Sequence, residues 1–136
     1  MKFVRSKKFM LNNKKTILIV EDDLMISSIY KSKFEMDGFI VVVANNGAEG
    51  IELAKKEKPD IIMLDIILPQ VDGFSVLEKI KKDKQTKLIP VIMLTNLSTE
   101  EDAAKGKELG AIDYLIKASL TPKQISEKIK QYLKIK

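Results

Sequence analysis

The stretch Ile61-Ile62-Met63-Leu64-Asp65 decides how this chain folds, because a short apolar run ends abruptly at an acidic residue. Four consecutive large apolar residues are typical of a strand that is buried on both faces of a sheet. Three further segments have the same design: residues 16–20, 91–94 and 112–116 are strand-like and are followed by Glu21, Thr95 and Lys117, respectively. In an open α/β sheet, ligands bind at the carboxyl ends of the strands. The pattern therefore predicts that these polar side chains meet at one edge of a sheet.

Helical signals lie between the strand-like segments. Helices are predicted from Asp23 to Gly38, from Asn46 to Pro59, across 74–80, from Ser98 to Gly110 and from Thr121 to about Leu133, with a further strand over 39–44. Ser98 with Glu101 is the predicted cap of the fourth helix, and Thr121 with Gln124 is that of the fifth. Strands that alternate with helices at this spacing indicate a parallel sheet that is covered on both faces.

The fold class that follows is α/β. We predict a doubly wound, five-stranded parallel sheet in the order 2-1-3-4-5 with five helices, which is a flavodoxin-like arrangement. The topological switch of such a sheet lies between strands one and three. These strands end at Glu21-Asp22-Asp23 and at Asp65, so the acidic residues are expected to converge at the crevice.

Composition limits the chemistry. The 136 residues include no cysteine and no histidine, which excludes a disulfide, a thiolate or histidine metal site, and a nucleophile paired with histidine within the chain. No apolar run approaches the length of a membrane span. Six Lys or Arg and no acid fall within residues 1–15, so this segment carries a charge of +6 and the rest of the chain is close to neutral, at −1 of the total of +5. We predict a basic extension over 1–15 and one domain over 16–136, and expect neither a membrane nor a nucleic acid as partner.

The acidic residues at the predicted sheet edge require a cation. Carboxylates about 4 Å apart repel each other by about 4 kcal/mol at an effective dielectric constant near 20, so they stay ionised only beside a positive charge. An all-oxygen site suits a hard ion such as Mg²⁺. An aspartate beside such an ion can accept a phosphoryl group as an acyl phosphate, while Lys117 and the Thr95 hydroxyl each hold a phosphoryl oxygen. The residues thus indicate phosphoryl transfer.

Five elements of the chain, in this order, resemble the receiver domains of two-component response regulators. They are Ile17-Leu18-Ile19-Val20-Glu21-Asp22, Leu64-Asp65 with Leu68-Pro69 and Asp72-Gly73, Met93-Leu94-Thr95, Asp113-Tyr114-Leu115-Ile116, and Lys117. The resemblance, to a stand-alone receiver of the chemotaxis type, covers the chain from about Thr16 to Leu133. It implies that Asp65 is the phosphoacceptor and that Thr95 and Lys117 assist the transfer.

The resemblance also implies a metal site and a switch. Asp22, Asp65 and the backbone carbonyl of Ile67 would bind Mg²⁺, with Glu21 acting through water. On phosphorylation, Thr95 would move toward the phosphoryl group and Tyr114 would turn inward. The surface of helix four, strand five and helix five would then change for a downstream protein.

The partners and setting follow from the same resemblance. The phosphoryl donor is expected to be a histidine kinase or a phosphotransfer protein, and the location is expected to be cytoplasmic. The domain would not be an enzyme in the usual sense, but a signalling phosphoacceptor that catalyses its own phosphorylation and slow dephosphorylation. A monomer is expected, or a weak dimer through the surface of helix four, strand five and helix five. No output domain follows the fifth helix, so we expect a stand-alone receiver or part of a longer chain.

The sequence departs from the family pattern in two loops. Ala118 replaces the usual proline after Lys117. A cis bond before a non-proline residue costs about 2.5–4 kcal/mol, so this peptide bond is predicted to be trans. The loop that follows it is then expected to take a different path from that of the family. Asn96 stands where a small residue is common. Ile67 and Leu97, which flank the approach of the hydrolytic water in the family, are apolar and branched, which predicts a long-lived phosphoryl group.

Three other functions would require features that this sequence lacks. A receiver-like interaction module that works without phosphorylation would have a broken acidic cluster, which this chain lacks. A flavodoxin-like electron carrier would need a phosphate loop rich in Ser, Thr or Gly where Glu21-Asp22-Asp23 stands. A haloacid-dehalogenase-type phosphatase would need Asp-x-Asp, but Ile66-Ile67 follows Asp65.

Overall fold

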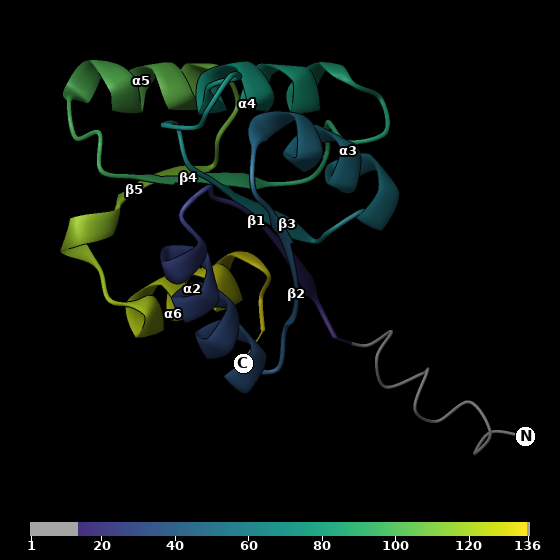
Figure 1. Cartoon of the computed structure of the whole chain (residues 1–136), viewed down its shortest axis with the longest axis vertical. Coiled ribbons are helices and arrows are strands. Elements are labelled where there is room, and N and C mark those ends of the chain that lie inside the picture. The colour runs from purple at the N-terminus through teal and green to yellow at the C-terminus, as the bar shows by residue number, and fades with distance from the viewer. Residues whose placement is uncertain (1–13, 136) are drawn as a thin grey trace, which may run out of the picture.

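The computed structural model describes residues 14–135 and confirms the predicted fold class. Five parallel strands form one sheet in the order β2-β1-β3-β4-β5 (Figure 1). The strands are β1 (Thr16–Val20), β2 (Ile40–Ala44), β3 (Ile61–Leu64), β4 (Val91–Thr95) and β5 (Asp113–Ile116). The described helices are α2 (Leu24–Met36), α3 (Gly47–Glu57), α4 (Gly73–Lys82), α5 (Glu100–Glu108) and α6 (Pro122–Tyr132), with a 3₁₀ turn, η1, at Lys117–Ser119. The basic extension predicted for residues 1–15 lies almost entirely outside the described residues.

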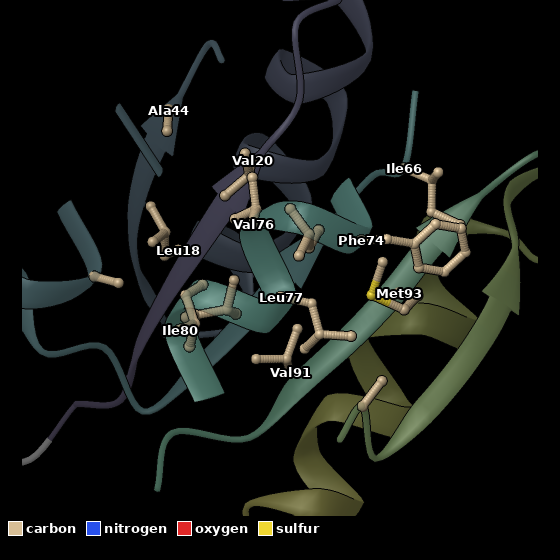
Figure 2. Close-up of a cluster of buried hydrophobic side chains, with 14 residues drawn as sticks. Leu18, Val20, Ala44, Ile66, Phe74, Val76, Leu77, Ile80, Val91 and Met93 are labelled. Atoms are coloured by element: carbon tan, nitrogen blue, oxygen red, sulfur yellow. The ribbon is translucent and has the colours of Figure 1, made fainter. Parts of the chain in front are cut away.

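The helices cover both faces of the sheet, because successive strand residues point to opposite faces. α2 and α6 lie on one face, and α3, α4 and α5 lie on the other (Figure 1). The first face buries a cluster that includes Ile17, Ile19, Tyr30, Phe34, Ile61, Met63, Ile92, Leu94, Ile125 and Ile129. Figure 2 shows the cluster on the second face, where strand residues Leu18, Val20, Val91 and Met93 gather with Val76, Leu77 and Ile80 of α4. Burial on both faces explains the continuous apolar runs of the central strands.

The strand register aligns the carboxyl ends that carry the polar residues. Val20 at the end of β1 is paired with Leu64 at the end of β3, so Glu21 and Asp65 leave the sheet side by side. On the other side of β3, Thr95 at the end of β4 is paired with Ile116 of β5, the residue before Lys117. No helix within residues 14–135 has the length and apolarity that a bilayer crossing needs.

Side-chain caps define where the later helices begin. Thr121 and Gln124 form the predicted reciprocal capping box of α6. The predicted cap of the helix after β4 is wrong by one residue, because Thr99, and not Ser98, accepts the backbone N–H of Asp102 (3.1 Å). Both positions have a hydroxyl three residues before an acid. Thr99 also donates its hydroxyl to the Asp102 carboxylate (2.8 Å), which adds a second bond to the cap.

Candidate functional site

Asp65 lies at the carboxyl end of β3 and is almost completely buried, with 7% of its surface exposed. Its Oδ1 accepts a hydrogen bond from the backbone N–H of Ile67 (3.2 Å), which orients the carboxylate within its own loop. Gly73 at the start of α4 lets this loop fold tightly. Its N–H donates to the Ile66 carbonyl (2.8 Å), and a Cβ at this position would lie 2.1 Å from the Asp65 carbonyl oxygen. A side chain at position 73 would therefore displace the loop that carries Asp65.

Lys117 joins two of the predicted acidic residues. Its Nζ donates a hydrogen bond to Asp65 Oδ2 (2.7 Å) and another to Glu21 Oε1, and the three side chains are 5–11% exposed. Lys117 is 52 residues from Asp65 and 96 residues from Glu21 in the sequence. The structure thus gathers one ammonium and two carboxylates at the edge of the sheet where the sequence predicts them.

Burial and charge act in opposite directions on this cluster. Burial raises the pKa of Glu21, and the hydrogen bond from Lys117 offsets this effect only in part. Burial alone would lower the pKa of Lys117, but its hydrogen bonds to Asp65 and Glu21 outweigh burial and raise that pKa. The two residues differ because Lys117 has two anionic partners, whereas Glu21 shares its cation with Asp65. Two carboxylates around one ammonium leave a net negative charge, which favours the binding of a further cation.

The three acidic residues after β1 have different surroundings. Glu21 faces Lys117 and also accepts the backbone N–H of Asp23 at its Oε2 (3.1 Å). Asp23 is the N-cap of α2 and accepts the N–H groups of Met25 (2.9 Å) and Ile26 (3.0 Å). Asp22, between them, is exposed to solvent.

The predicted metal ligands are all oxygens, which suits a hard divalent cation. Within the described part of the chain, no three acidic side chains lie close enough to form a metal-binding group. The structure therefore brings Glu21 and Asp65 together around Lys117, while Asp22 lies outside this contact.

Thr95 and Tyr114 both contact the loop that follows β4. The Thr95 side chain is completely buried, and its hydroxyl oxygen accepts the N–H of Leu97 (3.3 Å). The half-buried Tyr114 donates its hydroxyl to the Leu97 carbonyl (2.7 Å), and burial raises the pKa of Tyr114 to about 12. Gly106 of α5 makes room for this ring, since a Cβ there would lie 3.2 Å from Tyr114 Cδ2. The two predicted switch residues are thus connected through one residue of a short loop.

Two residues have a place at the site that the sequence reasoning did not assign. Tyr30 of α2 is buried and borders a small cavity with Glu21 and Asp65, and burial raises its pKa. Its helical spacing with other apolar residues indicated only a core position. Asn96 accepts the backbone N–H of Ala118 at its Oδ1 (3.1 Å), so the two departures from the family pattern are in contact. No peptide bond within residues 14–135 is cis, which confirms the prediction for the bond before Ala118.

Comparison with known proteins identifies the family. A family model described as the response regulator receiver domain matches residues 17–130. The chain therefore belongs to the response regulator receiver domain family. Receiver domains of this family are signalling phosphoacceptors of two-component systems that bind Mg²⁺ and switch on phosphorylation.

Two curated relatives show how much of a longer protein the chain matches. The chain is 46% identical over 101 residues to the DNA-binding dual master transcriptional regulator RpaA of Synechocystis sp., which covers 74% of this chain and 42% of that protein. It is 39% identical over 124 residues to the probable transcriptional regulator ycf27 of Guillardia theta, which covers 91% of this chain and 47% of the relative. The chain thus spans less than half the length of either protein.

Solved structures agree with the fold. A CheY-like response regulator receiver domain protein from Methanospirillum hungatei has a TM-score of 0.83 and 32% identity, over 90% of this chain and 95% of that one. The Mn²⁺-bound form of the response regulator Rcp1 has a TM-score of 0.76 and 27% identity, over 88% of this chain and 94% of that one.

Proposed function

We propose that this chain is a phosphorylation-dependent signalling switch that accepts a phosphoryl group on Asp65 from a histidine kinase or a phosphotransfer protein. The observation that carries this proposal is the contact between Lys117 Nζ and Asp65 Oδ2 (2.7 Å) at the carboxyl edge of the sheet. An ammonium in this place can neutralise the charge of a phosphoryl group that arrives at the carboxylate. Asp65 is also held in one orientation by the N–H of Ile67, so little reorganisation precedes attack.

The transfer itself is a displacement at phosphorus. An Asp65 carboxylate oxygen attacks the phosphorus atom and forms a new P–O bond, while the bond from phosphorus to the donor breaks. When the donor is phosphohistidine, its imidazole leaves and takes up one proton on the nitrogen that held the phosphoryl group; when the donor is acetyl phosphate, acetate leaves. The product is an acyl phosphate on Asp65. Its hydrolysis adds water at phosphorus, releases inorganic phosphate and a proton, and restores the carboxylate.

The residues that would hold the cation are Asp22, Asp65 and the backbone carbonyl of Ile67, with Glu21 acting through water. When bound, Mg²⁺ would supply positive charge to the phosphoryl oxygens. The Mn²⁺-bound Rcp1 structure supports a divalent cation in a related fold. Lys117 would then exchange part of its contact with Asp65 for a phosphoryl oxygen. Glu21 would keep a share of the Lys117 ammonium throughout.

The signal would leave the site through Thr95 and Tyr114. The Thr95 hydroxyl is buried at the end of β4 and would donate to a phosphoryl oxygen after a small movement. Such a movement would shift Leu97, which contacts both Thr95 and the Tyr114 hydroxyl. The surface of α5, β5 and α6 would change with it, and we propose this surface as the contact for a downstream protein. We also propose that the chain is a monomer, or a weak dimer through this surface, and that it is located in the cytoplasm.

The experiment is mass spectrometry of the protein after incubation with acetyl phosphate and Mg²⁺. We expect one phosphoryl adduct on the parent, its loss in Asp65→Asn, and its retention in Asp83→Asn, which changes an aspartate at the far end of α4. An adduct of equal yield in Asp65→Asn would refute the assignment. No adduct on the parent would favour the alternative, a receiver-like interaction module that works without phosphorylation.

A further inference from the structure

The loops after β4 and β5 are joined by one side chain. Asn96 Oδ1 accepts the backbone N–H of Ala118 at 3.1 Å. Asn96 directly follows Thr95, and Ala118 directly follows Lys117, so this hydrogen bond connects the neighbours of two residues that are proposed to bind the phosphoryl group. Because Thr95 is paired with Ile116 in the sheet, the bond continues the contact between β4 and β5 beyond the last backbone pair.

The bond lies at the start of the turn η1, which contains Lys117. Lys117 begins the turn η1, and no side chain caps the start of this turn. The hydrogen bond that closes the turn, from the Leu120 N–H to the Lys117 carbonyl, is long at 3.4 Å. Lys117 Nζ reaches Asp65 and Glu21 from the first residue of this turn, so a shift of the turn moves the point from which the lysine side chain extends. The hydrogen bond from the Ala118 N–H to Asn96 fixes the backbone one residue after Lys117.

An asparagine is well suited to this position. Its amide oxygen accepts the N–H without adding charge near a cluster that already contains Glu21 and Asp65. The partner must have an N–H, which alanine has and proline lacks. Asn96 and Ala118 therefore depend on each other: an acceptor at position 96 has no donor to bind if position 118 is proline.

We propose that Asn96 is a positioning residue for Lys117. Through the Ala118 N–H, it holds the start of η1 against the loop after Thr95 and keeps Lys117 Nζ beside Asp65. This proposal rests on the proposed function of Lys117 and Asp65. Asn96 itself does not touch the phosphoryl group in this account and acts only through the backbone of its neighbour.

The test is a double-mutant cycle with Asn96→Ala and Ala118→Pro, measured as the rate of phosphorylation by acetyl phosphate at fixed Mg²⁺. We expect Asn96→Ala to slow the reaction by about two- to tenfold, the range that one net hydrogen bond supplies. In the Ala118→Pro background, the same change should alter the rate by less than about twofold, because the donor is already absent. An equal loss in both backgrounds would overturn the proposal.

Two further measurements separate positioning from general loss of structure. Mg²⁺ affinity, followed by NMR titration, should be unchanged in Asn96→Ala, because Asn96 is not among the proposed ligands. Amide hydrogen exchange at Ala118 should become faster in the same variant, since its acceptor is lost. The matched control is Asn45→Ala, an exposed asparagine after β2 at the same sheet edge, which should change neither the rate nor the exchange.

The outcomes distinguish this proposal from the one on which it rests. If the parent protein is not phosphorylated at all, the proposed function fails, while the exchange rate at Ala118 still decides whether Asn96 holds this loop. If Ala118→Pro does not fold, the exchange rate and the Mg²⁺ titration of Asn96→Ala decide in the same way. If amide exchange at Ala118 is unchanged in Asn96→Ala, the hydrogen bond from Asn96 does not fix this loop, and the proposal is refuted.

Discussion

Replacing Lys117 with methionine should destabilise the folded protein in a way that depends strongly on pH. The substitution keeps the apolar stem but leaves Glu21 and Asp65 buried without their shared cation. Both carboxylates bind the same Nζ, whose N–H donors diverge at about the tetrahedral angle, so their oxygens lie about 4 Å apart. Two like charges at that separation repel each other by about 4 kcal/mol at an effective dielectric constant near 20. Loss of one partner from a buried ion pair has a cost of similar size, about 3–5 kcal/mol.

Proton uptake sets an upper limit to this cost. Protonating Glu21, whose ordinary pKa is 4.5, costs about 1.4 kcal/mol for each pH unit above that value. Protonation of Glu21 therefore removes the repulsion at a free-energy cost of about 3.4 kcal/mol at pH 7 and about 1.4 kcal/mol at pH 5.5. The sign follows from the pKa of Glu21, which burial raises and which loses the opposing hydrogen bond from Lys117 in the variant: the contribution of Glu21 to stability is present at low pH and is lost as the pH rises. In the parent, the raised pKa of Lys117 keeps its contribution constant over this range.

The assay is urea denaturation followed by far-ultraviolet circular dichroism in Mg²⁺-free buffer, since the chain has no tryptophan. We expect Lys117→Met to lower the free energy of unfolding by about 3 kcal/mol at pH 7 and by about 1–1.5 kcal/mol at pH 5.5. The control is Lys31→Met, which removes an exposed pair with Glu35 and should cost less than about 1 kcal/mol. The reasoning fails if Lys117→Met costs no more than the control, or if its cost is the same at both pH values.

Two other predictions concern the metal and the lifetime of the phosphoryl group. Asp22→Ala should weaken Mg²⁺ binding, measured by NMR titration, much more than Asp23→Ala, because Asp23 is engaged as the N-cap of α2; equal weakening would show that the triplet is divided differently. Phospho-Asp65 should decay slowly in Mg²⁺ buffer, because the side chains of Ile67 and Leu97 cannot hydrogen-bond an attacking water. In the double variant Ile67→Asn with Leu97→Glu, the decay should be faster by up to about 10²-fold, which is within the range of general-base assistance. A variant that decays no faster would show that these two positions do not limit hydrolysis.

Much of the fold could be predicted because the pattern of apolar and polar residues in each strand and helix indicates which of its faces are buried. An apolar run such as residues 61–64 is buried on both faces, and the polar residue after it marks the carboxyl end of a strand. The alternation of strands and helices then restricts the sheet to a few orders, since parallel connections are right-handed and short. The convergence of Glu21, Asp65 and Lys117 follows from the same logic, because all three follow strands of one parallel sheet.

The remaining features depend on contacts between loops, which local patterns do not encode. Ser98 and Thr99 both satisfy the spacing of a helix cap, and only the path of the chain after β4 selects Thr99. The sequence contains three acids after β1, but the direction of each side chain decides that Glu21 meets Lys117 while Asp22 faces solvent.

What the sequence determines alone is the sheet, its order and the edge at which the polar residues gather, because burial and periodicity act on each segment separately. What only the tertiary structure decides is which of those residues touch. The hydrogen bond between Asn96 and Ala118 is the clearest case, since the sequence marks each residue as a departure from the family pattern but does not indicate that the two meet. It forms because β4 and β5 are neighbours in register, which brings two loops that are 22 residues apart within one hydrogen bond of each other.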